Sequence, residues 1–296
     1  MSWQTLILGQ VFLVSISAIC IRAIAKKKQT SDAAYVVNAG MMTFLYAVGL
    51  IFIPFLEPAN TQVFFHFLPW FIGGGLCFGL GNVFGFKVMA HLDAGLAAVL
   101  GTVGTLFTII LAALVLHEDL NSRQAIGGFI ILSAVCYVLT IARQPGKHRM
   151  HNKSWLIGLG FSVLASAFFA LAIVNEKFLL NKSNTATYLL FGWGCQLIMA
   201  YALALVFQRK KFKLLFKPAV FKITFLGGIT RGLSGALFIL ALVKSNNVAL
   251  MTVITNLKLI IIVLLGAWLL SEKQKLTEKL TAAFLALAGL SIILWK

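Results

Sequence analysis

Ten long apolar segments follow one another along the chain, and they constrain its fold more than any other feature. Each is about as long as the roughly 20 residues that an α-helix needs to cross the hydrocarbon core of a membrane. The segments cover approximately residues 3–24, 33–56, 64–89, 94–116, 124–142, 155–180, 187–207, 219–243, 248–270 and 276–295. The connections between them are short and leave no room for a soluble domain. We therefore expect an all-α integral membrane protein with ten transmembrane helices.

The composition excludes the other broad classes of protein. Hydrophobic residues make up 60% of the chain and charged residues only 11%, against about 25% charged residues in soluble domains. A soluble globule of 296 residues could not cover that much apolar surface. A membrane β-barrel is excluded as well, because the apolar runs are continuous and do not alternate with polar residues.

The net charge is +17, and the lysines and arginines are distributed unevenly between the two sides of the predicted membrane. The odd-numbered connections, counted from the first, carry most of the lysines and arginines. Positive charge favours the cytoplasmic side, so we expect these connections inside and both termini outside a cytoplasmic membrane. A basic chain can also bind nucleic acid, but cations divided among short loops favour contact with anionic lipid headgroups instead. We expect membrane lipids as partners and no nucleic acid.

The sequence resembles itself at an offset of 154 positions. Residues 71–90 and 225–244 share phenylalanine and glycine positions in register, and the match continues without a gap to Glu118 and Glu272. A match of this length, ending on paired glutamates, favours a true internal repeat over a chance alignment of apolar helices.

The repeat divides the chain into residues 1–145 and residues 150–296, each with five predicted helices. Because five is an odd number, the second half would enter the membrane upside down relative to the first. Inverted repeats of this kind occur in many secondary transporters, which bind substrate at the repeat interface near the bilayer midplane. We therefore predict two inverted five-helix repeats.

The end of each half resembles a known family. The stretches are LAALVLHEDLNSRQAIGGFIILSAVCYVL (111–139) and LLGAWLLSEKQKLTEKLTAAFLALAGLSIIL (264–294), each with an apolar helix, a glutamate and a final helix. They are similar to the closing signature of EamA-type domains, and the whole chain resembles the ten-helix transporters of the drug/metabolite transporter superfamily. The resemblance implies export or exchange of small metabolites by alternating access, without specifying a substrate.

Two cations lie near the middle of predicted membrane segments, Arg231 in the eighth and Lys258 in the ninth. Ionisable residues at that depth cost roughly 2.5–3.5 kcal/mol each on insertion scales and indicate function by default. Their counterparts in the first half are Cys77 and Gly104, so the cations break the repeat, which favours a substrate role. We predict that both line a central cavity and bind a carboxylate or phosphate. The alternative is a structural cation satisfied by backbone carbonyls or water.

Uncharged residues at similar depth are further candidates for substrate contacts. They are Asn256, Asn82, Asn38, Thr102, Thr105 and Trp193. Each amide or hydroxyl could instead join helices, for about 0.6 kcal/mol, and the tryptophan could belong to the core. In a continuous helix Asn256 and Lys258 would point about 200° apart, so we do not expect both to face the cavity squarely.

Glycine pairs four positions apart predict close helix packing. They are Gly75/Gly79, Gly81/Gly85 and Gly228/Gly232.

The acids are expected to have structural roles. We expect Glu118 and Glu272 to cap turns or to pair with the nearby Arg123 or Lys273. Glu176 lies inside the sixth segment. We expect it to form a pair with the neighbouring Lys177 that reaches toward the outer membrane surface, although a proton or cation site is an alternative.

These observations predict a secondary transporter of a small anionic or zwitterionic metabolite, with amino acids as the first choice. The alternatives are exchange of phosphorylated metabolites or nucleotide sugars, a lipid-translocating protein, and a membrane enzyme acting on lipid. The chain contains no HExxH, Walker-type or serine-nucleophile motif, so we expect no enzyme, cofactor or metal. Small drug exporters of the superfamily keep a glutamate in the first helix; its absence here disfavours proton-coupled export of cationic drugs. The sequence leaves monomer and homodimer open.

Overall fold

The computed structural model describes residues 3–117, 122–143, 152–244, 251, 254–272 and 275–294. In this part of the chain every regular element is a helix, and there is no strand. The predicted all-α class is therefore confirmed.

The helices of the first half have the following bounds: α1 Trp3–Ala25, α2 Lys28–Ser31, α3 Ala34–Phe52, η1 Ile53–Phe55, α4 Thr61–His66, α5 Leu68–His91, α6 Ala94–Leu100, α7 Val103–Leu116 and α8 Ser122–Arg143. Those of the second half are α9 Asn152–Lys182, α10 Thr185–Thr187, η2 Tyr188–Gly192, α11 Trp193–Gln208, η3 Arg209–Phe216, α12 Pro218–Lys244, α14 Lys258–Leu269 and α15 Leu276–Leu294.

Seven helical stretches of the described residues are long and apolar enough to cross a membrane. They are Trp3–Ala25, Ala34–Phe55, Leu68–His91, Ala94–Leu116, Ser154–Lys182, Thr185–Phe216 and Pro218–Lys244. Residues Ile126–Tyr137 of α8 and Lys258–Leu269 of α14 form shorter apolar helices. The chain is therefore a multi-pass membrane protein. Each of the ten predicted segments overlaps a helix, though three of those helices are not among the seven long spans.

Two of the predicted segments are interrupted by turns. Gly101 and Thr102 form a turn between α6 and α7, and the ninth segment has a turn at Asn256 and Leu257 just before α14. Glycine is a poor helix former and threonine a mediocre one, and the Thr102 hydroxyl donates to the carbonyl of Val99 at 2.7 Å. Irregular backbone at this depth is tolerated where it is buried in protein or lines a cavity.

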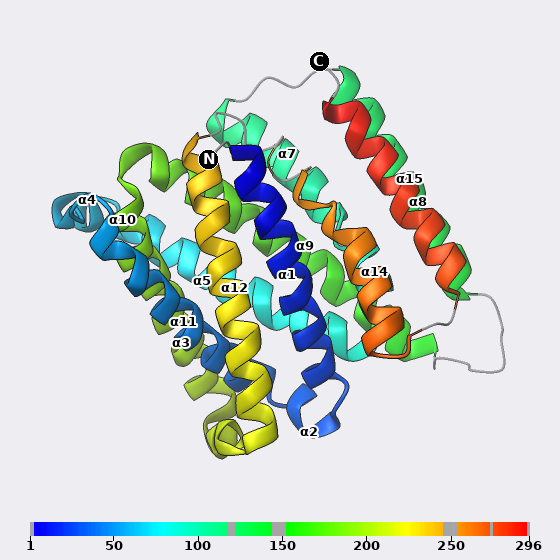
Figure 1. Ribbon diagram of the computed structural model, residues 1–296, viewed down its shortest axis with the longest axis horizontal. Helices are drawn as coiled ribbons and strands as arrows, with labels where there is room; N and C mark the ends of the chain where they lie inside the picture. Colours follow the sequence, from blue (N-terminus) through cyan, green and yellow to red (C-terminus); the bar gives the residue numbers. More distant parts are fainter. Residues whose placement is uncertain are drawn as a thin grey trace.

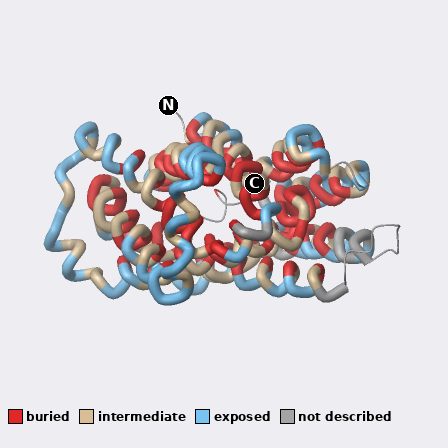
Figure 2. Tube along the Cα trace, turned by 90° about the horizontal axis from the view of Figure 1, so that it is seen from below, coloured by how far each residue is buried: buried red, intermediate tan, exposed pale blue. Residues whose placement is uncertain are grey.

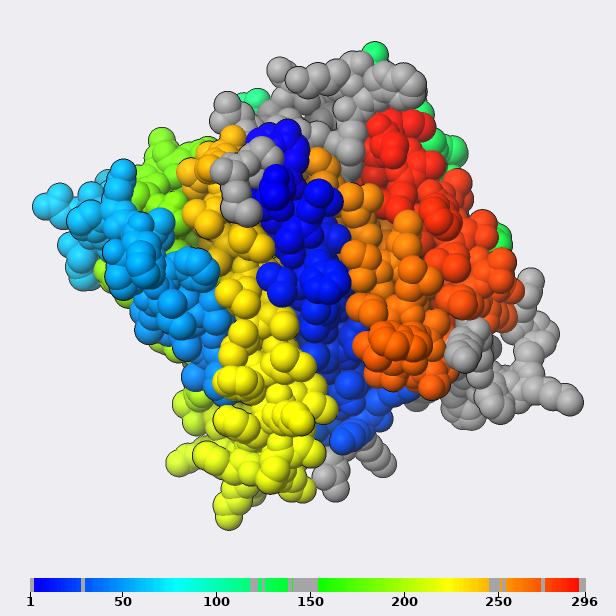
Figure 3. Space-filling view, in the orientation of Figure 1, coloured from blue at the N-terminus to red at the C-terminus, as the bar shows by residue number. Residues whose placement is uncertain are grey.

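The helix contacts come in matched pairs between the two halves. α1 packs on α12 as α9 packs on α5, α3 packs on α12 as α11 packs on α5, and α1 packs on α14 as α9 packs on α7. α8 and α15 pack on each other at one edge of the bundle (Figure 1). On one face, α12, α1 and α14 lie side by side although they are distant in sequence (Figure 3).

Buried residues concentrate where the helices face one another, and exposed residues lie on the outward surfaces (Figure 2). Many of the exposed side chains are large and apolar, among them Leu114, Phe129 and Trp268. A soluble protein rarely exposes so much apolar surface, whereas a lipid environment solvates it. The arrangement therefore fits a bundle with lipid around it and its polar groups inside.

Candidate functional site

A cavity of about 360 Å³ lies inside the bundle. Its lining comes from α1, α3, α5, α6, α7, α9, α11, α12, the turn before α14, and α14 itself, and no described residue of α8 or α15 belongs to it. Cavities that bind small molecules have volumes of about 300–1,000 Å³. The space is therefore of the size that a small metabolite needs.

Arg231 enters this cavity from α12. Its Nη2 donates a hydrogen bond to Oδ1 of Asn82 on α5, and its guanidinium carbon lies 6.0 Å from the centroid of the Phe169 ring on α9. The amide and the aromatic face hold the planar guanidinium in one orientation. Asn82 in turn points its Nδ2 toward the Met42 sulfur at 3.9 Å.

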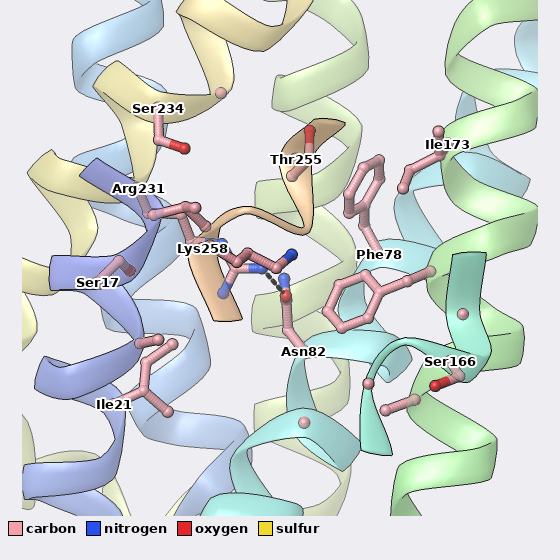
Figure 4. A pocket seen from close by; sticks show the side chains of 18 of the residues that line it. Ser17, Ile21, Phe78, Asn82, Ser166, Ile173, Arg231, Ser234, Thr255 and Lys258 are labelled. Carbon is pink, nitrogen blue, oxygen red and sulfur yellow. Dashed lines mark hydrogen bonds between the residues drawn. The ribbon is translucent and has the colours of Figure 1, made fainter. Parts of the chain in front are cut away.

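Lys258 enters the same cavity from the first position of α14, and its side chain lies beside that of Arg231 (Figure 4). Among the residues that the structure describes, neither cation forms an ion pair. Two like charges in a confined space repel each other, and this repulsion is relieved when an anion binds between them. The cavity therefore has an anion-binding character.

Asn256 and Lys258 both line the cavity, contrary to the expectation from a continuous helix. The turn at Asn256 and Leu257 breaks the helical periodicity, so the angle of about 200° does not apply. Nδ2 of Asn256 donates to Oγ1 of Thr105 on α7 at 2.6 Å, which joins the two interrupted segments.

Six of the eight predicted site residues line the cavity: Arg231, Lys258, Asn256, Asn82, Thr105 and Trp193. Thr102 and Asn38 are buried but are not among the lining residues. Thr102 instead closes its own turn, and Nδ2 of Asn38 has no hydrogen-bond partner among the described residues. The sequence could not show that these two residues miss the cavity, because hydropathy gives the depth of a residue but not the direction of its side chain.

The sequence interpretation missed Glu176 as a cavity residue. Glu176 lines the cavity from α9 with 3% of its surface exposed, and it hydrogen-bonds Tyr188. The expected pair with Lys177 that reaches the membrane surface is wrong: Lys177 is also buried, and its Nζ donates to the carbonyl of Leu242 at 3.0 Å. The sequence held one signal for this position: Glu176 is seven residues from Phe169, which places both residues on the same face of α9.

Small hydroxyl residues of the cavity were also missed. They are Ser17, Ser162, Ser166 and Ser234. Nothing distinguishes these serines in the sequence from serines that bond their own helix backbone.

Glu272 pairs with Arg22 at the end of α1 and with Lys26 just after it, two partners that the sequence interpretation did not name. Its Oε1 lies 2.7 Å from Nε of Arg22 and 3.6 Å from Nζ of Lys26. Its Oε2 accepts a hydrogen bond from the backbone N–H of Ala94 at 2.8 Å. Sequence proximity could not suggest these two partners, because they come close to Glu272 only through the packing of α14 against α1. Glu118 and Lys273 lie outside the described residues.

The predicted close packing of glycines is confirmed at three positions. A Cβ at Gly75 would lie 2.8 Å from the backbone carbon of Cys195. A Cβ at Gly228 would lie 2.8 Å from the carbonyl oxygen of Met41, and one at Gly232 would lie 3.1 Å from the Cα of Leu45. These glycines let α5 approach α11 and let α12 approach α3.

A helical bundle with an apolar outer surface and two buried cations in an internal cavity fits a membrane transporter for small molecules. Residues 1–140 match the sequence profile of the EamA-like transporter family, which belongs to the drug/metabolite transporter superfamily. The first half of the chain thus carries the sequence signature of a membrane transporter of this type, a family whose substrates are small molecules.

Comparison with solved structures agrees with the fold. A crystal structure titled "Crystal structure of protein" superposes with a TM-score of 0.64 at 15% identity, over 98% of this chain and 96% of that one. No curated protein matches the sequence significantly. Within the described residues there is no group of three or more His, Cys, Asp or Glu side chains that could hold a metal ion.

Proposed function

We propose that the protein is a secondary transporter of small organic solutes that carry a carboxylate, with amino acids as the first choice. The observation that carries this proposal is the pair Arg231 and Lys258, which share one cavity without an ion-pair partner among the described residues. Arg231 presents a planar set of donors that matches a carboxylate, and Asn82 already fixes its orientation. Lys258 adds a second positive charge beside it.

Amino acids are favoured because the rest of the lining also suits them. Oxygen atoms of Ser166, Ser234 and Asn256 could accept hydrogen bonds from an ammonium group, and Phe78 and Phe169 offer apolar contacts. Exchange of phosphorylated metabolites or nucleotide sugars is the second candidate, since the same two cations would bind a phosphate.

The two halves are proposed to be inverted repeats, residues 1–145 and 150–296, that rock around the cavity. The matched helix contacts support this arrangement. The turns at Gly101–Thr102 and Asn256–Leu257 support it as well. When the two halves are aligned at the offset of 154 positions, the two turns differ by only one position. Alternating access then exposes the cavity to each side of the membrane in turn.

The orientation is proposed from the positive charge. Three connections are rich in lysine and arginine: the one after α1, the one before α9 and the one after α11. In a cytoplasmic membrane these connections would face the cytoplasm, and both termini would lie outside. The ion pairs of Glu272 with Arg22 and Lys26 lie on this side, where they tie the two halves together. They would hold the cavity closed toward the cytoplasm.

Flux in proteoliposomes tests the proposed function. The purified protein is expected to give saturable uptake of one or more radiolabelled amino acids from a panel, and Arg231→Gln and Lys258→Gln are expected to abolish it. Lys182→Gln, at the exposed end of α9, is the matched control and should behave as wild type. Uptake that survives both cavity substitutions would show that the anion is bound elsewhere. Inhibition of uptake by phosphorylated metabolites would favour the second candidate.

A further inference from the structure

Glu176 is a buried carboxyl group for which the proposed transport cycle has so far given no task. It lines the cavity with 3% of its surface exposed. It has no ion pair among the described residues. Its hydrogen bond is with Tyr188, whose hydroxyl accepts in turn from Nε2 of Gln196 at 3.4 Å.

The charged and titratable groups around Glu176 do not neutralise it. On its own helix, Lys177 is directed to the carbonyl of Leu242. From η2 comes Tyr188, from α11 come Gln196 and Cys195, and α12 brings Arg231 into the cavity. The cavity residues of α5, α6 and α7 include no acid or base. An anionic carboxylate would therefore be buried here without a close counter-charge, which is costly.

The carboxyl lies on the same face of α9 as the ring against which Arg231 packs. Phe169 and Glu176 are seven residues apart, which is almost two full turns, or roughly 10 Å along the helix axis. From this axial rise we infer a separation on the order of 10 Å between the Glu176 carboxyl and the proposed anion site, within one cavity. At this separation the two sites influence each other through their charge without touching.

We propose that Glu176 is a proton-binding site whose proton is taken up together with the anionic solute. The proposal rests on the transport function above. With the cavity empty, the charges of Arg231 and Lys258 favour the carboxylate form of Glu176. A bound anion cancels that field and so favours the protonated form. By linkage, protonation of Glu176 strengthens anion binding to the same degree.

The size of this effect follows from Coulomb's law. Over roughly 10 Å at an effective dielectric constant of about 20, one unit charge changes the proton affinity of a carboxyl on the order of tenfold. Solute and proton would then cross the membrane in the same direction. A proton fits this group better than a metal cation, because Glu176 supplies the one carboxylate among the described lining residues and Gln196 directs an N–H toward Tyr188.

Accumulation driven by a pH gradient tests the coupling. The probe is the radiolabelled amino acid with the greatest saturable flux in the panel, with wild type, Glu176→Gln and the matched control Glu57→Gln, an exposed acid in a connection, in parallel. An outside that is more acidic is expected to raise accumulation on the order of tenfold for wild type and control. Glu176→Gln should retain downhill exchange and lose this response. An unchanged response in Glu176→Gln, a response of opposite sign, or accumulation driven by sodium instead of protons would overturn the proposal.

Two further measurements keep the proton site testable by itself. Infrared difference spectra of substrate-free protein, taken between alkaline and acidic pH, should show the carbonyl band of a protonated carboxyl appear on acidification, and Glu176→Gln should lack it; a band that survives the substitution would overturn the assignment. If the band is present as expected while no solute in the panel is transported, the transport proposal alone fails. If Glu176→Gln does not reconstitute, Tyr188→Phe should shift the pH profile of uptake, and an unchanged profile would overturn the proposal.

Discussion

Arg22 and Glu272 form an ion pair across 250 positions of sequence, with Nε and Oε1 2.7 Å apart. Their side chains are only 11% and 8% exposed. The same carboxylate lies 3.6 Å from Nζ of Lys26 and accepts the N–H of Ala94, the first residue of α6. One glutamate thus joins the end of α1, the start of α6 and the connection between α14 and α15.

Removing this carboxylate is expected to destabilise the protein. Breaking a buried ion pair by deleting one partner costs about 3–5 kcal/mol, because the remaining charge stays buried and uncompensated. Glu272→Gln should therefore lower the temperature at which detergent-solubilised protein loses its monodisperse peak in size-exclusion chromatography. The double variant Arg22→Met/Glu272→Met should be more stable than Glu272→Gln alone, since it leaves no unpaired charge at this position except the exposed Lys26. Glu57→Gln is the control, and equal midpoints for Glu272→Gln and Glu57→Gln would contradict the prediction.

The bond from Arg231 to Asn82 is expected to determine how well the proposed transporter binds its solute. A hydrogen bond to a charged group contributes about 1.5–3 kcal/mol, and Asn82→Ala removes the group that orients the guanidinium. KM for the transported amino acid should rise at least tenfold in Asn82→Ala, measured as saturation of initial flux. Arg231→Lys keeps the charge but loses the planar contact with Phe169, so it should also raise KM while retaining some flux. A KM unchanged in both variants would show that the anion does not bind at Arg231.

The sequence was sufficient for the helical class and for the depth of the two cavity cations, because hydropathy reports how costly each residue is in lipid. The sequence could not show toward which side of its helix each side chain points. Asn38 and Asn82 are equally deep by sequence, yet only Asn82 reaches the cavity, since rotation about a helix axis is decided by packing partners. Glu176 was misjudged for a related reason: Lys177 is its neighbour in sequence but bonds to a carbonyl on another helix.

The proposed orientation predicts which connections a membrane-impermeant reagent can reach. Lys27 and Lys211 are exposed in two of the positively charged connections, and Glu57 is exposed in a connection of the other set. In a cysteine-free background, Glu57→Cys in intact cells should react with an impermeant maleimide. Lys27→Cys and Lys211→Cys should react only after the membrane is opened. Labelling of Lys27→Cys or Lys211→Cys in intact cells would reverse the orientation and place the Glu272 ion pairs outside.

Two glycines on α5, two positions apart, should respond in opposite ways to the same added methyl group. A Cβ at Gly75 would lie 2.8 Å from the backbone carbon and 2.9 Å from the carbonyl oxygen of Cys195. Backbone atoms of α11 cannot rotate away as a flexible side chain can, so α5 and α11 must separate. Overpacking of this kind costs about 1–3 kcal/mol. A Cβ at Gly73 has no atom within 4 Å, and replacing a helical glycine with alanine gains up to about 1 kcal/mol. Gly75→Ala should therefore lower the thermal midpoint in detergent, while Gly73→Ala leaves it unchanged or raises it. If both substitutions move the midpoint in the same direction and by the same amount, the close approach of α5 to α11 is not what limits residue size at Gly75.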